Sequence, residues 1–224
     1  MAHQLVFPLP AHVALGAEDF FVSKANEAAY TTVLDRARWP DRRLVLTGPE
    51  ASGKSHLVRI LSRQAGAEVM PSQTLSRLAR PPQTPLVVIE DADRIGTPEA
   101  EEALFHLHNH LASTGGKLLL TARTAPARWP LTLPDLASRM QAITPVTIDA
   151  PDDALLRVLL AKHFTDRQLN PPPDVIEKLA TRIDRSFAAA ARIVAHLDQQ
   201  ALAQQRQITW PFARTVLEGT EDAL

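Results

Sequence analysis

A glycine-rich segment followed by lysine and serine is the feature of this sequence that most directly suggests chemistry. Residues 48–55 follow the pattern G-x-x-x-x-G-K-S, in which backbone N–H groups surround phosphate oxygens at the start of a helix. In such a loop Lys54 brings a positive charge to the β- and γ-phosphates, and the Ser55 hydroxyl can bind Mg²⁺. The predicted nucleotide-binding residues here are Gly48, Pro49, Glu50, Ala51, Ser52, Gly53, Lys54, Ser55 and His56.

The segments on either side of this loop support the prediction. Residues 44–47 form a compact apolar run typical of a buried strand, and residues 54–64 place Leu57, Ile60 and Leu61 on one face of a helix. A chance match in a surface turn is the alternative, and it would not require a strand before the loop and a helix after it.

A second candidate for phosphate chemistry is an apolar run that ends in two carboxylates. Residues 86–89 predict a central parallel strand buried on both faces, and Glu90 and Asp91 follow it. Beside a phosphate-binding loop, such carboxylates hold Mg²⁺ and polarise water. The sequence leaves open which of the two binds the metal, and acids that merely end a strand are the alternative.

Strands and helices alternate until about residue 150, and only helices are predicted beyond it. This order indicates an α/β fold, a parallel sheet flanked by helices, followed by an all-α C-terminal lid. We expect an N-terminal segment at 1–16, an α/β core at 17–150 and a helical lid at 151–224. The further predicted helices are 26–37, 97–113, 152–167, 174–183, 186–205 and 211–217, the further strands are 68–70, 117–122 and 143–148, and residues 80–85 are a proline-rich loop.

Composition narrows the functional classes. The net charge is −1 and cysteine is absent, which argues against general nucleic-acid coating and excludes disulfides and thiolate metal sites. The start of the sequence lacks the features of a signal peptide, and no apolar run approaches the ~20 residues that cross a bilayer. We therefore expect a bacterial-type cytoplasmic protein without membrane partners.

With these motifs the sequence resembles the AAA+ domain of DnaA, and among the DnaA-related proteins it is most similar to the Hda family. The resemblance covers essentially the whole chain, and its most specific part is residues 133–139, which are similar to the family's arginine-finger segment. The other matching residues are Phe21 and Val22 with Asn26, Ala28 and Ala29 in the nucleotide-base segment, 117–121 with Pro126 at the first sensor, 183–185 at the second sensor, and 208–209 with 211–212 in the last lid helix.

The resemblance implies roles for two arginines. Arg139 would act in trans as an arginine finger on the nucleotide of DnaA, and Arg185 would detect the nucleotide bound to this chain and couple it to the lid. A surface salt bridge is the alternative for either arginine. One departure from the family pattern is Arg123, which stands where the first sensor usually has an acidic or amide side chain. Because arginine cannot accept a proton, we expect weak ATP hydrolysis at most.

The N-terminal residues resemble the sliding-clamp-binding peptide of the Hda family. Pro8 and Pro10 favour extended backbone, and extended peptides bind by burying alternate apolar side chains in a groove. Packing on the protein's own core is the alternative. The resemblance assigns clamp binding to Gln4, Leu5, Phe7 and Leu9.

Together these features predict a negative regulator of replication initiation. It would bind ADP or ATP with Mg²⁺, bind the sliding clamp (the β subunit of DNA polymerase III), and stimulate ATP hydrolysis by the AAA+ domain of DnaA. We expect no sequence-specific DNA binding, and a monomer or homo-oligomer according to the bound nucleotide. The alternatives are a DnaC-like helicase loader with ATPase activity and a non-catalytic, clamp-tethered DnaA adaptor.

Overall fold

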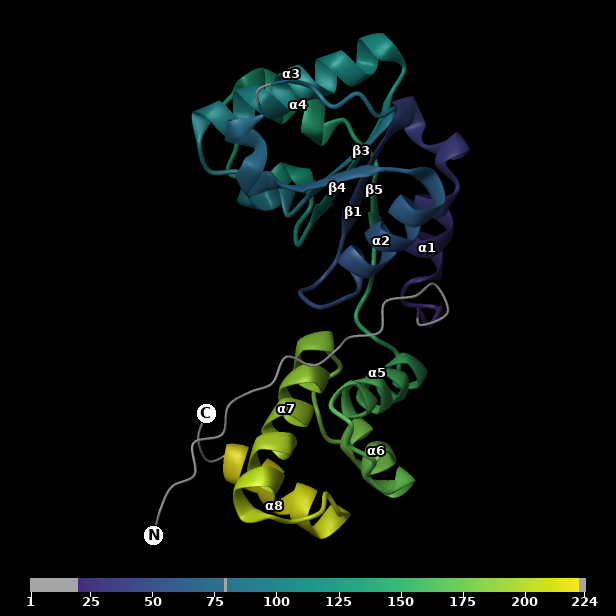
Figure 1. Ribbon diagram of the computed structural model, residues 1–224, viewed down its shortest axis with the longest axis vertical. Helices are drawn as coiled ribbons and strands as arrows, with labels where there is room; N and C mark the ends of the chain where they lie inside the picture. Colours follow the sequence, from purple (N-terminus) through teal and green to yellow (C-terminus); the bar gives the residue numbers. More distant parts are fainter. Residues whose placement is uncertain (1–19, 79, 222–224) are drawn as a thin grey trace. The chain divides into compact units, whose positions relative to one another are not determined.

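The protein consists of two units. The computed structural model describes residues 20–78 and 80–221. An α/β unit extends to Asp149, and a helical unit begins at Ala150 (Figure 1). None of the helices in the described ranges is long and apolar enough to span a membrane.

The α/β unit is built on a five-stranded parallel sheet with the strand order β2-β3-β4-β1-β5. In the register, Thr47 of β1 pairs with Ala122 of β4, and Ile89 of β3 pairs with Leu120 of β4. The carboxyl ends of β3, β4 and β1 therefore lie next to one another on one edge of the sheet. The strands are β1 (Arg43–Thr47), β2 (Glu68–Pro71), β3 (Leu86–Glu90), β4 (Lys117–Ala122) and β5 (Pro145–Thr147).

Helices cover both faces of this sheet, with α3 and α4 on one face and α1 and α2 on the other (Figure 1). Alternate strand residues such as Val45, Val87 and Leu118 pack with Leu104 of α3 and Met140 of α4 in a buried core. The helices of this unit are α1 (Glu27–Leu34), α2 (Lys54–Ala65), α3 (Pro98–Thr114) and α4 (Pro134–Gln141), with short 3₁₀ helices at Arg36–Arg38, Pro40–Arg42, Ser72–Arg77, Ala92–Arg94 and Pro126–Arg128.

Within residues 150–221, the helical unit contains four helices around a core of its own. Asp152 and Ser186 cap two of them, since their side chains accept hydrogen bonds from Leu155 N and Ala189 N. No strand occurs among residues 150–221, so the predicted change to helices alone is confirmed for this range. The helices are α5 (Asp153–Asp166), α6 (Pro173–Ala180), α7 (Phe187–Gln204) and α8 (Trp210–Glu221).

Three features of the α/β unit differ from what the sequence predicts. The strand predicted over 143–148 is limited to Pro145–Thr147. The helix predicted over 26–37 ends at Leu34, because Asp35 leaves helical geometry with ψ at 69° and a separate 3₁₀ turn follows. The sequence predicts no secondary structure for the residues of α4, which include only two buried side chains, Leu136 and Met140. So short a segment gives too little apolar periodicity to identify a helix.

A buried glutamate ties the start of α4 to α3. The Glu101 carboxylate is almost fully buried and accepts hydrogen bonds from Thr132 N, from the Thr132 hydroxyl at 3.0 Å and from Leu133 N at 2.7 Å. Burial acts to raise the pKa of Glu101, but the hydrogen bonds from Leu133 and Thr132 outweigh it and hold that pKa below its usual range. Because Leu133 is the N-cap of α4, Glu101 fixes the position at which this helix begins.

Replacing Glu101 with glutamine is expected to destabilise the protein by about 1–3 kcal/mol, since an amide cannot accept all of these hydrogen bonds. The folded-state pKa is lowered, so the stabilisation is complete above about pH 4.3, the ordinary glutamate value, and is lost as the pH falls through the lowered pKa. Urea denaturation at several pH values checks this, with the exposed neighbour Glu102→Gln as the control. A deficit for Glu101→Gln that is unchanged between pH 3 and pH 7 would contradict it.

Candidate functional site

The glycine-rich loop joins the carboxyl end of β1 to the first turn of α2. Gly53 takes a left-handed backbone, with φ of 91°, directly before the helix begins at Lys54. Gly48 is needed for a different reason: a Cβ there would lie 2.9 Å from Ser52 Oγ and 3.1 Å from Ile148 Cβ. At Gly48 the loop therefore passes close to Ser52 and Ile148. It leads into the N-terminus of α2, where backbone N–H groups can bind a negatively charged group.

Lys54 places a mostly buried cation in this loop. Its Nζ donates hydrogen bonds to the carbonyl oxygens of Gly48 and Pro49, both at 2.7 Å. Burial lowers the pKa of Lys54; the carboxylate of Asp91 opposes this most strongly, while Arg123 adds to it. The ammonium group is thus held by backbone oxygens in a field shaped by residues that follow β3 and β4.

The two serines of the loop differ in burial. Ser52 is buried, and its Oγ has no hydrogen-bond partner among the residues that the structure describes. Ser55, in the first turn of α2, is exposed. An unpaired buried hydroxyl next to a buried ammonium group is suited to an oxygen-rich ligand.

The predicted carboxylates lie at the same edge, at the end of β3. Glu90 is partly buried, and its Oε1 lacks a partner within the described part of the chain. Asp91 has a left-handed backbone with φ of 54°, which is uncommon for a non-glycine residue. That conformation is braced from two sides, because Asp91 N donates to Thr121 Oγ1 at 3.2 Å and Ser72 Oγ donates to Asp91 O at 2.7 Å.

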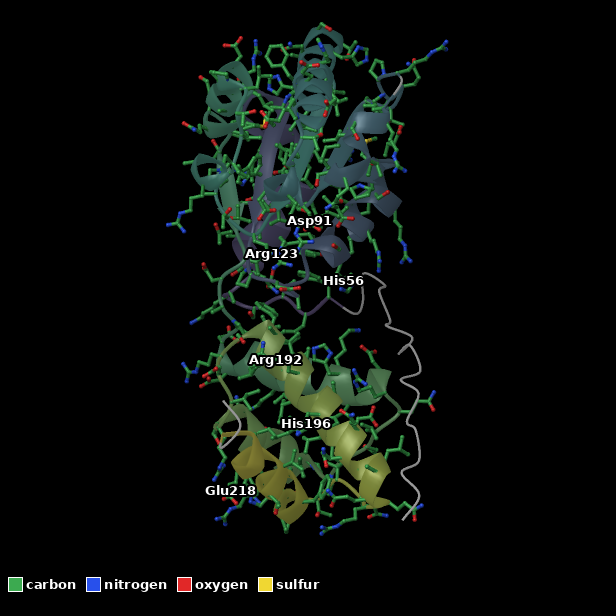
Figure 2. The ribbon with its side chains drawn as sticks, turned by 90° about the vertical axis from the view of Figure 1, so that its left-hand side faces the viewer. His56, Asp91, Arg123, Arg192, His196 and Glu218 are labelled. Carbon is green, nitrogen blue, oxygen red and sulfur yellow. The ribbon has the colours of Figure 1, made fainter. Side chains whose placement is uncertain are left out.

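Arg123 connects the end of β4 to the loop. Its Nη1 lies 2.9 Å from Glu50 Oε2, and its backbone N–H donates to Asp93 Oδ2 at 3.0 Å. Figure 2 shows Arg123, Asp91 and His56 at the same end of the α/β unit. The strand order explains the arrangement, because β4 lies between β3 and β1.

Two residues at this edge were not identified from the sequence. Asp93 braces Arg123, and its Oδ1 is buried without a partner in the described residues; its position in the turn that follows β3 was the available signal. Phe20 stacks on Tyr30 and meets the ring of His56 edge-on at 5.3 Å. Phe20 is an isolated aromatic residue before α1, and no sequence pattern indicates its position near the loop.

Phe21 and Val22 are exposed at the predicted base-binding segment, with 43% and 40% of their surface accessible. Asn26 holds this segment in place, since its Nδ2 donates to Phe21 O at 2.9 Å and its Oδ1 accepts from Ser23 N at 2.8 Å. The exposed apolar pair thus follows Phe20, whose ring lies close to Gly53 of the loop.

The predicted arginines are not part of this cluster. Arg139 is exposed on α4, and its guanidinium lies 5.0 Å from the centroid of the Phe105 ring. It lines a pocket with Arg43 and Gly116, which stand at the amino ends of β1 and β4. Arg185 belongs to the helical unit, where its Nη2 lies 2.9 Å from Asp153 Oδ1. Gln4, Leu5, Phe7 and Leu9 lie outside the described residues.

The fold is similar to that of several solved structures. Domain III of the replication initiation protein DnaA from Thermotoga maritima superposes with a TM-score of 0.76 at 19% identity, covering 94% of this chain and 98% of that one. The AMPPCP-bound DnaA from Aquifex aeolicus gives a TM-score of 0.69 at 16% identity, covering 97% and 72%. The Thermotoga maritima RuvB Holliday junction branch migration motor gives 0.63 at 17% identity, covering 92% and 72%.

The sheet order, the glycine-rich loop and these neighbours define an AAA+ fold. Residues 152–217, which form most of the helical unit, match the family described as the Hda lid domain. The chain thus combines an AAA+ fold with a helical unit in which residues 152–217 are similar to the Hda lid domain.

Replacing Gly48 with alanine is expected to destabilise the α/β unit by about 1–3 kcal/mol, since the new methyl group would overlap Ser52 and Ile148. Gly96→Ala is the matched control, because the nearest atom to its added Cβ is 3.9 Å away, and it is expected to change stability by less than about 1 kcal/mol. Urea denaturation compares the two. Equal effects of both substitutions would show that close packing at Gly48 does not matter.

Proposed function

We propose that this chain is a nucleotide-dependent negative regulator of replication initiation that acts on DnaA. An adenine nucleotide with Mg²⁺ would bind at the carboxyl edge of the sheet, and Arg139 would act on the nucleotide held by the AAA+ domain of DnaA. The observation that carries the proposal is the combination of a phosphate-binding loop around Lys54 with an Hda-type lid at residues 152–217.

Nucleotide binding is supported by the hydrogen-bonding groups of the loop. The Lys54 ammonium group donates to two backbone carbonyls, and phosphate oxygens are stronger acceptors that can replace them. Ser52 Oγ adds a buried group without a partner in the described residues. The similar DnaA from Aquifex aeolicus is described as AMPPCP-bound. We assign ADP as the resident nucleotide from the Hda relationship.

Mg²⁺ fits the donors at this edge. The described residues contain no cluster of three or more His, Cys, Asp or Glu side chains able to hold a metal, and Mg²⁺ typically binds to phosphates, waters and one or two carboxylates. Ser55 and either Glu90 or Asp91 would provide the protein ligands. When bound, the ion would neutralise charge on the β- and γ-phosphates.

The same residues support nucleotide retention over turnover. Arg123 offers only donors and is paired with Glu50 of the loop, so it can attract phosphate but cannot accept a proton from an attacking water. We therefore propose weak intrinsic hydrolysis, with Arg185 as the residue through which the lid detects the nucleotide.

Arg139 is suited to act on a second protein. It is exposed, and it forms no ion pair within the part of the chain that the structure describes; its ring contact with Phe105 leaves the charge uncompensated. A guanidinium aimed at a γ-phosphate stabilises the charge that develops during hydrolysis and contributes about 10³–10⁵ in rate. Residues 4–9 would keep the protein on the sliding clamp while Arg139 acts on DnaA.

Arg139→Ala is expected to abolish stimulation of DnaA without affecting folding, because the side chain is exposed and forms no hydrogen bond within the described residues. The assay follows labelled ATP bound to DnaA in the presence of clamp-loaded DNA and measures its conversion to ADP. Arg128→Ala, another exposed arginine of the same unit, is the control and should stimulate normally. This chain alone should convert little ATP.

Full stimulation by Arg139→Ala would contradict the assignment of the finger. If the wild-type protein binds the clamp and DnaA but causes no acceleration, the chain is an adaptor. Turnover of its own ATP that is stimulated by single-stranded DNA would instead identify a DnaC-like loader.

A further inference from the structure

We propose that a basic pocket at the amino edge of the sheet is a second ligand site, which binds a phosphate-bearing anion. The pocket has a volume of about 410 Å³ and is lined by Arg42, Arg43, His108 and Arg139, with Gly115 and Gly116 between them. It lies at the starts of β1 and β4, whereas the glycine-rich loop follows the end of β1. It is therefore distinct from the proposed nucleotide site.

Positive charge dominates the lining. Asp41 is the only carboxylate among the residues that form the pocket, against three guanidinium groups. In the described ranges none of these three arginines is paired with a carboxylate. Burial first, and then the charges of Arg43 and Arg139, lower the pKa of His108, which shows that the field of the arginines reaches this ring.

Arg43 brings an incompletely paired cation to this pocket. It is 95% buried, with a relative exposure of 5%. Its Nη1 donates to Gly116 O at 2.8 Å and its Nη2 to His108 O at 3.2 Å, but its Nε has no partner among the described residues. Buried donors normally find an acceptor, so the Arg43 guanidinium keeps unsatisfied hydrogen-bonding capacity beside the pocket that it lines.

Capping of the C-terminus of α3 explains the positions of Arg42 and Arg43 but not the positive charge of the pocket. Arg42 Nη1 donates to Gly115 O at 2.6 Å, so both arginines satisfy carbonyl oxygens at the end of the helix. The ends of α3 and α4 each contribute roughly half a negative charge. Together with Asp41 they offset about two of the three positive charges, and the pocket remains positive.

The backbone around the pocket is fixed in an uncommon geometry. Asp41 and Arg42 both have left-handed backbones, with φ of 47° and 61°, and Gly115 opposite them has φ of 72°. Left-handed backbone is costly for residues that carry a Cβ and is concentrated at ligand sites. A phosphate group, with close to two negative charges and three acceptor oxygens, matches several guanidinium groups better than a single carboxylate does.

The test uses pyrophosphate as the probe, and NMR spectra of the full chain report which site it occupies. The amides of Gly115 and Gly116 report the basic pocket, and those of Gly48 and Gly53 report the glycine-rich loop. We expect saturable shifts of Gly115 and Gly116 that persist in Lys54→Ala. Arg139→Ala and Arg42→Ala should each weaken this binding by about ten-fold or more, while Arg42→Lys should retain part of it.

Two controls, a variant outside the pocket and a different anion, separate binding in the pocket from a general effect of charge. Arg128→Ala removes one exposed positive charge outside the pocket and should leave the affinity unchanged. Shifts confined to Gly48 and Gly53, equal shifts with acetate at matched ionic strength, or unchanged affinity in both arginine variants would each overturn the proposal. Arg42→Ala removes a hydrogen bond to Gly115 O, whereas Arg139→Ala removes a side chain that forms no hydrogen bond within the described residues, so Arg139→Ala tests the pocket without disturbing the fold.

An anion bound in the basic pocket should inhibit stimulation of DnaA. This expectation rests on the proposed function, because Arg139 would both line the pocket and act on the nucleotide of DnaA. Pyrophosphate, with Mg²⁺ in excess, should reduce stimulation of DnaA by the wild-type protein at least two-fold, and Arg42→Ala should resist that reduction. Equal inhibition of both proteins would contradict the link. If the wild-type protein does not stimulate DnaA at all, the proposed function fails, while the NMR shifts still decide whether the pocket binds the anion.

Discussion

The site depends on one constraint: three parallel strands end side by side, and a buried lysine lies where they end. Lys54 is only 8% exposed, and a buried ammonium group requires acceptors and nearby negative charge. Gly48 and Pro49 provide the acceptors, and Asp91 provides the charge that most raises the pKa of Lys54. These groups come together because β4 pairs with both β1 and β3.

Much of this arrangement could be predicted from the sequence, for identifiable reasons. The five strands and seven of the helices carry apolar patterns or strong end signals, such as Thr97 before Pro98 at the start of α3. The glycine-rich loop has a fixed residue spacing, as expected of a backbone that wraps a phosphate group. Features of this kind can be predicted because they depend on residues close together in the sequence.

What could not be predicted depends on contacts between distant residues. Nothing near Arg123 in the sequence indicates that it pairs with Glu50, 73 positions earlier, and the hydrogen bonds from Thr132 and Leu133 to Glu101 are equally remote. The basic pocket combines Arg43 with Arg139, which only the folded sheet brings together. Arg139 is thus both the proposed arginine finger and a lining residue of a pocket at the opposite edge of the sheet from Lys54.

Amide hydrogen exchange with and without MgADP tests most directly whether the carboxyl edge of the sheet is a nucleotide site. We expect slower exchange in residues 48–57 and around Glu90 and Asp91 when MgADP is present, because phosphate oxygens would engage the loop amides and order the strand ends. In Lys54→Ala this protection should be lost. Unchanged exchange in residues 48–57 of the wild-type protein at saturating MgADP, or equal protection in Lys54→Ala, would contradict the assignment of this edge as the nucleotide site.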